Sequence, residues 1–92
     1  MLSFVSDNLD TYKIEFYDHS RIMLKSCIWA DDQIIEDDDS RNCTTITFTS
    51  TQSFKIEEWL LAQGMYAKPL APQWLVNSWK ENIKEMVKLA DL

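Results

Sequence analysis

Residues 72–90 have a strong helical pattern, and this segment constrains the fold more than any other. Its apolar residues fall within one arc of a helical wheel: Leu75, Val76, Trp79, Ile83, Met86, Val87 and Ala90. Polar and charged residues fill the rest of the wheel, which predicts an amphipathic α-helix with a wide apolar stripe. Pro72 suits the first helical turn, because an N–H group at that position has no helical partner. A stripe of this width needs another element to cover it.

A β-sheet built from the first fifty residues is the expected cover. Residues 12–17 alternate in the manner of a strand, with Tyr12, Ile14 and Phe16 on one face. Residues 22–29 and 43–50 predict two more strands, and residues 2–5 a short edge strand or an N-terminal arm. Pairing of Phe16 with Ile22 would gather the apolar side chains on one side of the sheet, so we expect that register. The Ile34–Ile35 pair either pins the intervening loop to the core or adds a brief strand.

Two helices follow these strands. Residues 54–63 predict the first helix, with Ser53 as its N-cap and Gly64 just past its end. Residues 65–71 are expected to form an extended connection around Pro69. Strands followed by helices predict an α+β fold: a three- or four-stranded antiparallel sheet, arranged as a meander, with both helices packed on one face. A length of 92 residues predicts that the whole chain, residues 1–92, is one small domain.

The aromatic residues are divided between the core and the opposite sheet face. We expect Trp59 and Trp79 to meet over Phe16 and Phe48, and Trp74 either to pack under the connection or to be exposed. The expected register leaves four residues on the outer face of the sheet: Tyr17, Met23, Cys27 and Trp29. Two interpretations of that face stay open. It is partly covered by the N-terminal arm or the long loop, or it contacts a partner or a second copy.

A run of acidic residues is the strongest local feature. Six acids occur between positions 31 and 39 with no base among them: Asp31, Asp32, Glu36, Asp37, Asp38 and Asp39. The run is interpreted either as a solvated hairpin loop or as a surface that meets Lys and Arg on a partner in place of nucleic-acid phosphates. It lacks the glycine and the distal glutamate of an EF-hand calcium loop.

The overall charge limits the classes of partner. A net charge of −6 argues against direct nucleic-acid binding and against docking on anionic lipid, but it permits a protein partner with a basic surface. No apolar run reaches the length of a membrane span, and no signal pattern begins the chain, which predicts a cytoplasmic protein without membrane association. Cys27 and Cys43 are expected to be reduced thiols.

Catalytic and metal-binding signals are weak. His19 is the single histidine, and a dyad with Cys27 would lack an orienting group and an oxyanion hole. Two cysteines and one histidine are one ligand short of a zinc site. We therefore expect a protein that is not an enzyme and that holds no cofactor and no metal.

One fragment has a local resemblance to a known family. Residues 70–79, with the sequence LAPQWLVNSW, resemble the closing helix of BRCT domains, in which a tryptophan follows a short strand. The resemblance covers about a tenth of the chain. The rest departs from that family, because the glycines are missing and no helix is expected after the first strand.

These observations predict a non-enzymatic protein-binding module, a small acidic inhibitor or adaptor. In type it is similar to anti-CRISPR proteins and other nucleic-acid mimics that act on nucleic-acid-handling complexes. The six acids at positions 31, 32 and 36–39 would steer a basic partner, and aromatic and apolar side chains such as Tyr17, Met23 and Trp29 would anchor it. The alternative is a structural homo-oligomer, for example a homodimer, that associates through the outer sheet face carrying the same three residues.

Overall fold

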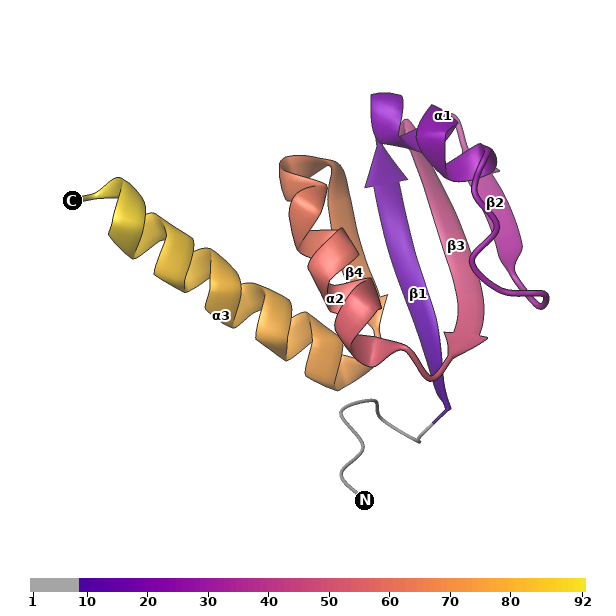
Figure 1. The fold of residues 1–92 in the computed structure, drawn as a ribbon. Helices are drawn as coiled ribbons and strands as arrows, with labels where there is room; N and C mark the ends of the chain where they lie inside the picture. The colour runs from indigo at the N-terminus through magenta and orange to yellow at the C-terminus, as the bar shows by residue number, and fades with distance from the viewer. Residues whose placement is uncertain (1–8) are drawn as a thin grey trace, which may run out of the picture.

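The computed structural model describes residues 9–92, so the expected strand or arm at residues 2–5 lies outside the described part. The chain runs through strands, helices and one 3₁₀ turn in this order: β1 (Asp10–Tyr17), α1 (His19–Lys25), β2 (Ile34–Asp38), β3 (Cys43–Ser50), α2 (Ser53–Ala62), η1 (Gly64–Tyr66), β4 (Ala67–Ala71) and α3 (Gln73–Ala90) (Figure 1). No helix within residues 9–92 has both the length and the apolar character needed to cross a membrane.

The strands form one antiparallel sheet in the order β2-β3-β1-β4, which confirms the predicted α+β class. β1 lies inside the sheet and pairs with β3 along its whole length, with Tyr12 opposite Phe48 and Ile14 opposite Ile46. The order differs from a simple meander because β1 pairs with β3 and β4 and not with β2. Strand 43–50 has the predicted bounds.

The core lies on one face of this sheet. Tyr12, Ile14 and Phe16 of β1 are fully buried there, as their alternation predicts. Helices α1 and α2 cover this face, and the start of α3 reaches the same core (Figure 1). They contribute four buried apolar side chains: Leu24, Ile56, Leu60 and Leu75.

The predicted strand at residues 22–29 is wrong, and so is its pairing with β1. Residues 22–25 belong to helix α1, and the following residues form a loop. Arg, Met, Leu and Lys are good helix formers, and Leu24 and Ser20, one turn apart, are buried together. Ile22 is 76% exposed, so the alternating apolar residues that indicated a strand do not form one buried face.

The structure also answers the expectations for the Ile34–Ile35 pair, for the connection around Pro69 and for the ends of the first predicted helix. The Ile34–Ile35 pair begins strand β2. The connection around Pro69 becomes strand β4, which lies at the edge of the sheet, where a residue without an N–H donor is tolerated. Ser53 is the first residue of α2 and not its N-cap, while Gly64 follows the helix with a positive φ of 60°, as expected for a residue that ends a helix.

The structure confirms two of the expected tryptophan placements, that of Trp59 and the exposed alternative for Trp74, which is 38% exposed. Trp59 packs on Phe16, with a ring-centroid distance of 5.1 Å, as expected. Trp29 takes the place over Phe48 that was expected for Trp79, and its ring lies 4.0 Å from that of Trp59. Trp74 meets Tyr12 edge-on at 6.2 Å and donates a hydrogen bond to Asp10 at 3.2 Å, so it packs on the start of β1.

Candidate protein-binding surfaces

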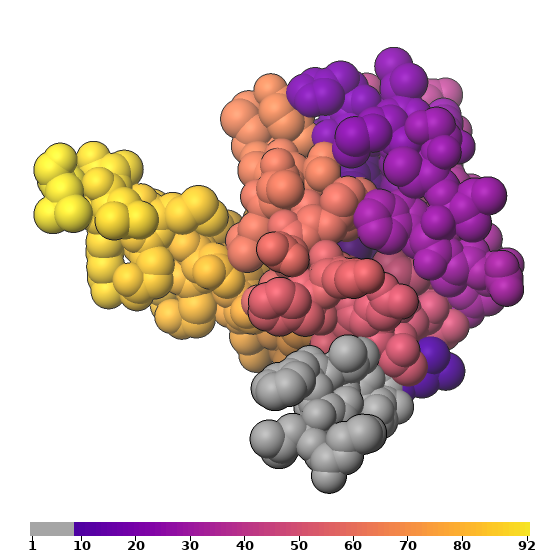
Figure 2. Space-filling view, viewed as in Figure 1, coloured from indigo at the N-terminus to yellow at the C-terminus, as the bar shows by residue number. Residues whose placement is uncertain are grey.

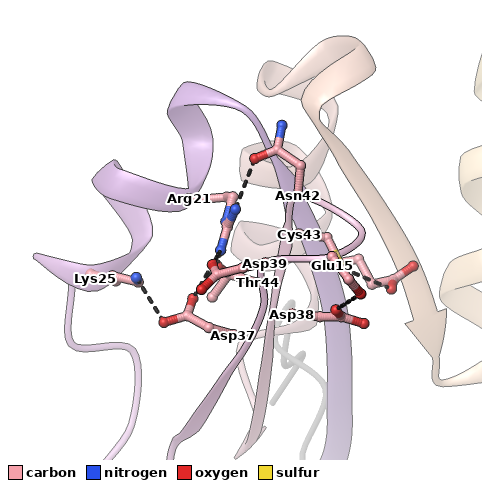
Figure 3. Close-up of polar contacts among 10 residues, drawn as sticks. Glu15, Arg21, Lys25, Asp37, Asp38, Asp39, Asn42, Cys43 and Thr44 are labelled. Carbon is pink, nitrogen blue, oxygen red and sulfur yellow. Dashed lines mark hydrogen bonds and ion pairs between the residues drawn. The ribbon is translucent and has the colours of Figure 1, made fainter.

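Asp31 and Asp32 lie in the turn before β2, whereas Glu36, Asp37 and Asp38 lie on β2 and Asp39 in the turn that leads to β3. Helix α1 faces Asp37 and Asp39 (Figure 3). Arg21 of α1 reaches into this hairpin. Its Nη2 atom lies 2.7 Å from Asp39 Oδ1 and 3.5 Å from Asp37 Oδ1. Its other nitrogens donate to Asn42 Oδ1 at 2.8 Å and to Thr44 Oγ1 at 2.9 Å. The guanidinium group therefore ties α1 to both strands of the hairpin.

Asp37 has two further partners besides Arg21. Lys25 Nζ lies 2.8 Å from its Oδ2 atom, and Thr44 Oγ1 donates to Oδ1 at 2.5 Å. The hydrogen bond from Lys25 is the largest cause that lowers the pKa of Asp37, to about 2, and those from Thr44 and Arg21 act in the same direction. This carboxylate is thus satisfied within the chain, and a partner would compete with Lys25 for it.

The other acids of the run differ in whether they have a hydrogen-bond or ion-pair partner. Asp32 accepts hydrogen bonds from the Thr49 hydroxyl at 2.5 Å and the Thr49 N–H at 3.2 Å, which lower its pKa. Asp38 accepts a hydrogen bond from Ser40 at 2.6 Å, which lowers its pKa too. Within residues 9–92, the exposed side chains of Asp31 and Glu36 have no ion-pair partner. Most acids of the run thus make contacts within the chain, while Asp31 and Glu36 face solvent, as does the paired Asp39, whose side chain is 91% exposed.

The outer face of the sheet is polar around β1 and β3. Glu15 is 5% exposed there, and it accepts a hydrogen bond from Tyr17 at 3.0 Å and pairs with Arg41 at 3.1 Å. Burial, followed by this hydrogen bond, raises the pKa of Tyr17 to about 12. Burial likewise raises the pKa of the Cys43 thiol, which holds it in the unreactive protonated form.

Within residues 9–92, the outer surface expected from Tyr17, Met23 and Trp29 is not formed. Tyr17 lies on the outer sheet face, but Met23 lies on α1 and is 40% exposed. Trp29 packs on the core side, where Gln33 holds its loop by accepting a hydrogen bond from the Trp29 N–H at 2.6 Å. The three residues do not share a surface, because the strand that would have aligned them is a helix and a loop.

The weak catalytic candidates are not assembled either. His19 begins α1 and Cys27 follows its end, so the helix separates them. The His19 ring packs against Tyr66 at a centroid distance of 4.3 Å. In the part of the chain that the structure describes, no group of three or more His, Cys, Asp or Glu side chains is arranged to hold a metal ion.

An apolar groove between the end of α2 and α3 is the surface that sequence reasoning missed. The distal turns of α3 stand clear of the body as a separate lobe (Figure 2). The groove measures about 400 Å³ and has no charged residue in its lining: Leu61, Gly64, Met65, Trp79, Ile83, Met86, Val87 and Ala90. Five of these residues belong to the predicted apolar stripe, so the stripe was the signal for the groove.

The stripe of α3 is covered at one end only. Leu75 is fully buried, and Trp79 and Ile83 are half-buried. Farther along, Met86 is 49% and Val87 is 54% exposed. The sequence predicted that the sheet would cover the whole stripe, and this is wrong, because α3 packs beside edge strand β4 and then leaves the body (Figure 1).

Charge differs between the two sides of this groove. A second hollow shares Leu61 with it and is lined by Phe54, Glu57, Glu58 and Asn82. The polar side of α3 carries three lysines and two glutamates: Lys80, Glu81, Lys84, Glu85 and Lys88. The lining that α2 contributes to the second hollow is therefore acidic, with Glu57 accepting a hydrogen bond from Ser78 of α3 and Glu58 exposed, whereas α3 has a slight excess of positive charge.

No protein-family model and no curated protein sequence matches this chain. The local resemblance of residues 70–79 to the closing helix of BRCT domains thus has no family match to support it. Function has to be argued from the surfaces described above.

Proposed function

We propose that the chain is a non-enzymatic protein-binding module, an adaptor or inhibitor, which receives an amphipathic helix in the groove between α2 and α3. The observation that carries this proposal is the half-exposed apolar stripe of α3 beside an uncharged groove. Contiguous exposed apolar surface on a small protein typically marks an interaction site. The groove is lined by apolar side chains and Gly64, with no charged residue among them.

A helix is the occupant that the groove fits best. Two helical elements form its walls, and an amphipathic helix commonly binds by laying its apolar face into such a groove. Met65 and Met86 line opposite walls, and methionine side chains adapt to a variety of apolar partners. The neighbouring Glu57 and Glu58 favour a helix that carries lysine or arginine along one edge.

The acidic hairpin has a smaller place in this proposal. Charge mimicry of a nucleic acid, as in anti-CRISPR-like inhibitors, needs carboxylates that are free to meet a partner. Asp37 and Asp39 are already paired with Lys25 and Arg21, which lowers the support for that form of the proposal. Asp31 and Glu36 remain available to steer a basic partner. The two free cysteines fit a reducing, cytoplasmic setting.

The test is binding of labelled helical peptides, measured by fluorescence anisotropy. The probes are an amphipathic peptide with leucines on one face and lysines along one edge, and a scrambled peptide of the same composition. We expect the full chain to bind the amphipathic peptide and not the scrambled one. Met65→Glu places a charge at the groove wall and should weaken binding about tenfold or more.

Ile28→Glu is the matched control. Ile28 is 86% exposed and Met65 is 80% exposed, so both substitutions replace an exposed apolar side chain by the same acid. Ile28 lies in the loop after α1, away from the groove. Equal binding by the wild-type chain and the Met65→Glu variant would contradict the proposal, as would equal binding of the scrambled peptide.

A further inference from the structure

We infer that the helix which occupies the groove is α3 of a second copy of this chain. The inference rests on the proposed function and names its partner. The occupant must be a helix with a wide apolar face, and it must carry positive charge to suit the acidic side of the groove. Helix α3 has both properties, since its stripe is incompletely covered and three lysines lie on its polar side.

Charge distribution supports self-association through this end of the molecule. Helix α3 has three lysines and two glutamates, so its net charge is +1. The whole chain has a net charge of −6, which leaves −7 for the remaining residues. Two bodies of net charge −7 repel each other strongly, whereas two α3 helices of net charge +1 repel each other far less. Because α3 projects away from the body, pairing through it keeps the acidic parts of both copies apart (Figure 2).

The arrangement is also self-complementary. Each copy supplies a groove and a projecting helix, so a two-fold axis allows the α3 helix of each to enter the groove of the other. Lys80 of one copy then faces the side of the groove that carries Glu58 of the other, while Lys84 and Lys88 keep their pairs with Glu81 and Glu85 of their own helix. A single interface then buries the apolar stripes of both copies and fills both grooves.

Helix stability gives a further reason for a cover. Helix α3 is about 27 Å long, and in the part of the chain that the structure describes its residues from Lys84 to Ala90 are all exposed. Short helical segments in water are marginal without tertiary packing. A second copy would supply that packing along the exposed part of the stripe, at Met86, Val87 and Ala90.

The test is sedimentation equilibrium of the full chain over a range of concentrations. We expect a monomer–dimer equilibrium in the wild-type chain. Val87→Glu, inside the groove, should weaken dimerisation about tenfold or more. Leu89→Glu is the matched control on the same helix, because Leu89 is 68% exposed and does not line the groove, and it should leave dimerisation within about threefold of wild type.

The outcomes separate this inference from the proposed function. A wild-type chain that stays monomeric at all concentrations overturns the inference. If that monomer still binds the basic amphipathic peptide in a Met65-dependent way, the proposed function stands and the partner is another protein. A monomer in which removal of residues 1–8 speeds hydrogen exchange of residues 83–92 would assign the groove to that segment and overturn the inference. A dimer that Val87→Glu leaves intact would also overturn the inference.

Discussion

Lys25 Nζ lies 2.8 Å from Asp37 Oδ2, and this ion pair joins helix α1 to strand β2. The contact gives a clear pH dependence. The pKa of Asp37 falls from its ordinary value of 3.8 to about 2 in the folded chain. A lowered pKa in the folded state stabilises the protein above the unfolded value, and this contribution is lost as the pH falls through the folded value.

We therefore expect the thermal unfolding temperature of wild type to decrease between pH 3.8 and about 2. Asp37→Asn should have a lower unfolding temperature at neutral pH and a shallower decrease over that window. Asp31→Asn, which changes an exposed acid of the same run, is the control and should behave as wild type. The account of the hairpin fails if both variants unfold like wild type at every pH.

Replacing a leucine by alanine should destabilise the protein more at the start of α3 than at its end. Leu75 is fully buried, so Leu75→Ala should lower the free energy of unfolding by about 2–5 kcal/mol. Leu89 is 68% exposed and lies outside the groove, so Leu89→Ala should change it by no more than about 0.5 kcal/mol. Urea denaturation followed by circular dichroism measures both values. Equal costs at the two positions would contradict the placement of α3.

The two thiols should differ in reactivity towards a disulfide reagent. Cys43 is 1% exposed and burial raises its pKa, whereas Cys27 is half-buried in a loop. We expect Cys27 to react in the native protein and Cys43 to react only once the sheet opens, since the thiolate is the attacking form. The reaction should therefore have a fast and a slow phase, and the Cys27→Ser and Cys43→Ser variants show which thiol gives each phase. A rapid native phase in Cys27→Ser would contradict the burial of Cys43.

Tyr17 should titrate late at alkaline pH. Its pKa is raised from 10.0 to about 12 by burial and by its hydrogen bond to Glu15. A raised pKa in the folded state gives stability that is complete below pH 10 and is lost as the pH rises through about 12. In ultraviolet titrations, the difference between wild type and Tyr17→Phe reports this group, and Glu15→Gln should move its pKa towards 10. An ordinary pKa in the wild-type chain would contradict the contact.

Sequence reasoning succeeded where a single period determined the structure. Strands 10–17 and 43–50 alternate, and their apolar faces meet in the core. It failed at residues 22–29, where the alternating pattern favours a strand and helix propensity favours a helix, so tertiary contacts determine the structure. Arg21 and Lys25 lie one helical turn apart, and this spacing lets both reach the hairpin acids. No local pattern reveals that long-range pairing.

Only part of the candidate site could be predicted from the sequence. The stripe from Leu75 to Ala90 was identified, but the sequence does not say which part of it the body covers. That depends on where β4 joins the sheet and on the direction in which α3 leaves it. The acidic run was the more conspicuous signal, yet the structure uses most of its carboxylates internally, at Asp32, Asp37, Asp38 and Asp39.

Hydrogen exchange of the distal half of α3 tests the central claim, which is that this stripe is covered in solution. Peptides spanning residues 83–92 would be followed by mass spectrometry at low and high protein concentration. We predict amide protection that increases with concentration and is lost in Val87→Glu but retained in Leu89→Glu. Rapid exchange of these amides at every concentration, with no difference between the two variants, would contradict the claim that a second copy covers the groove.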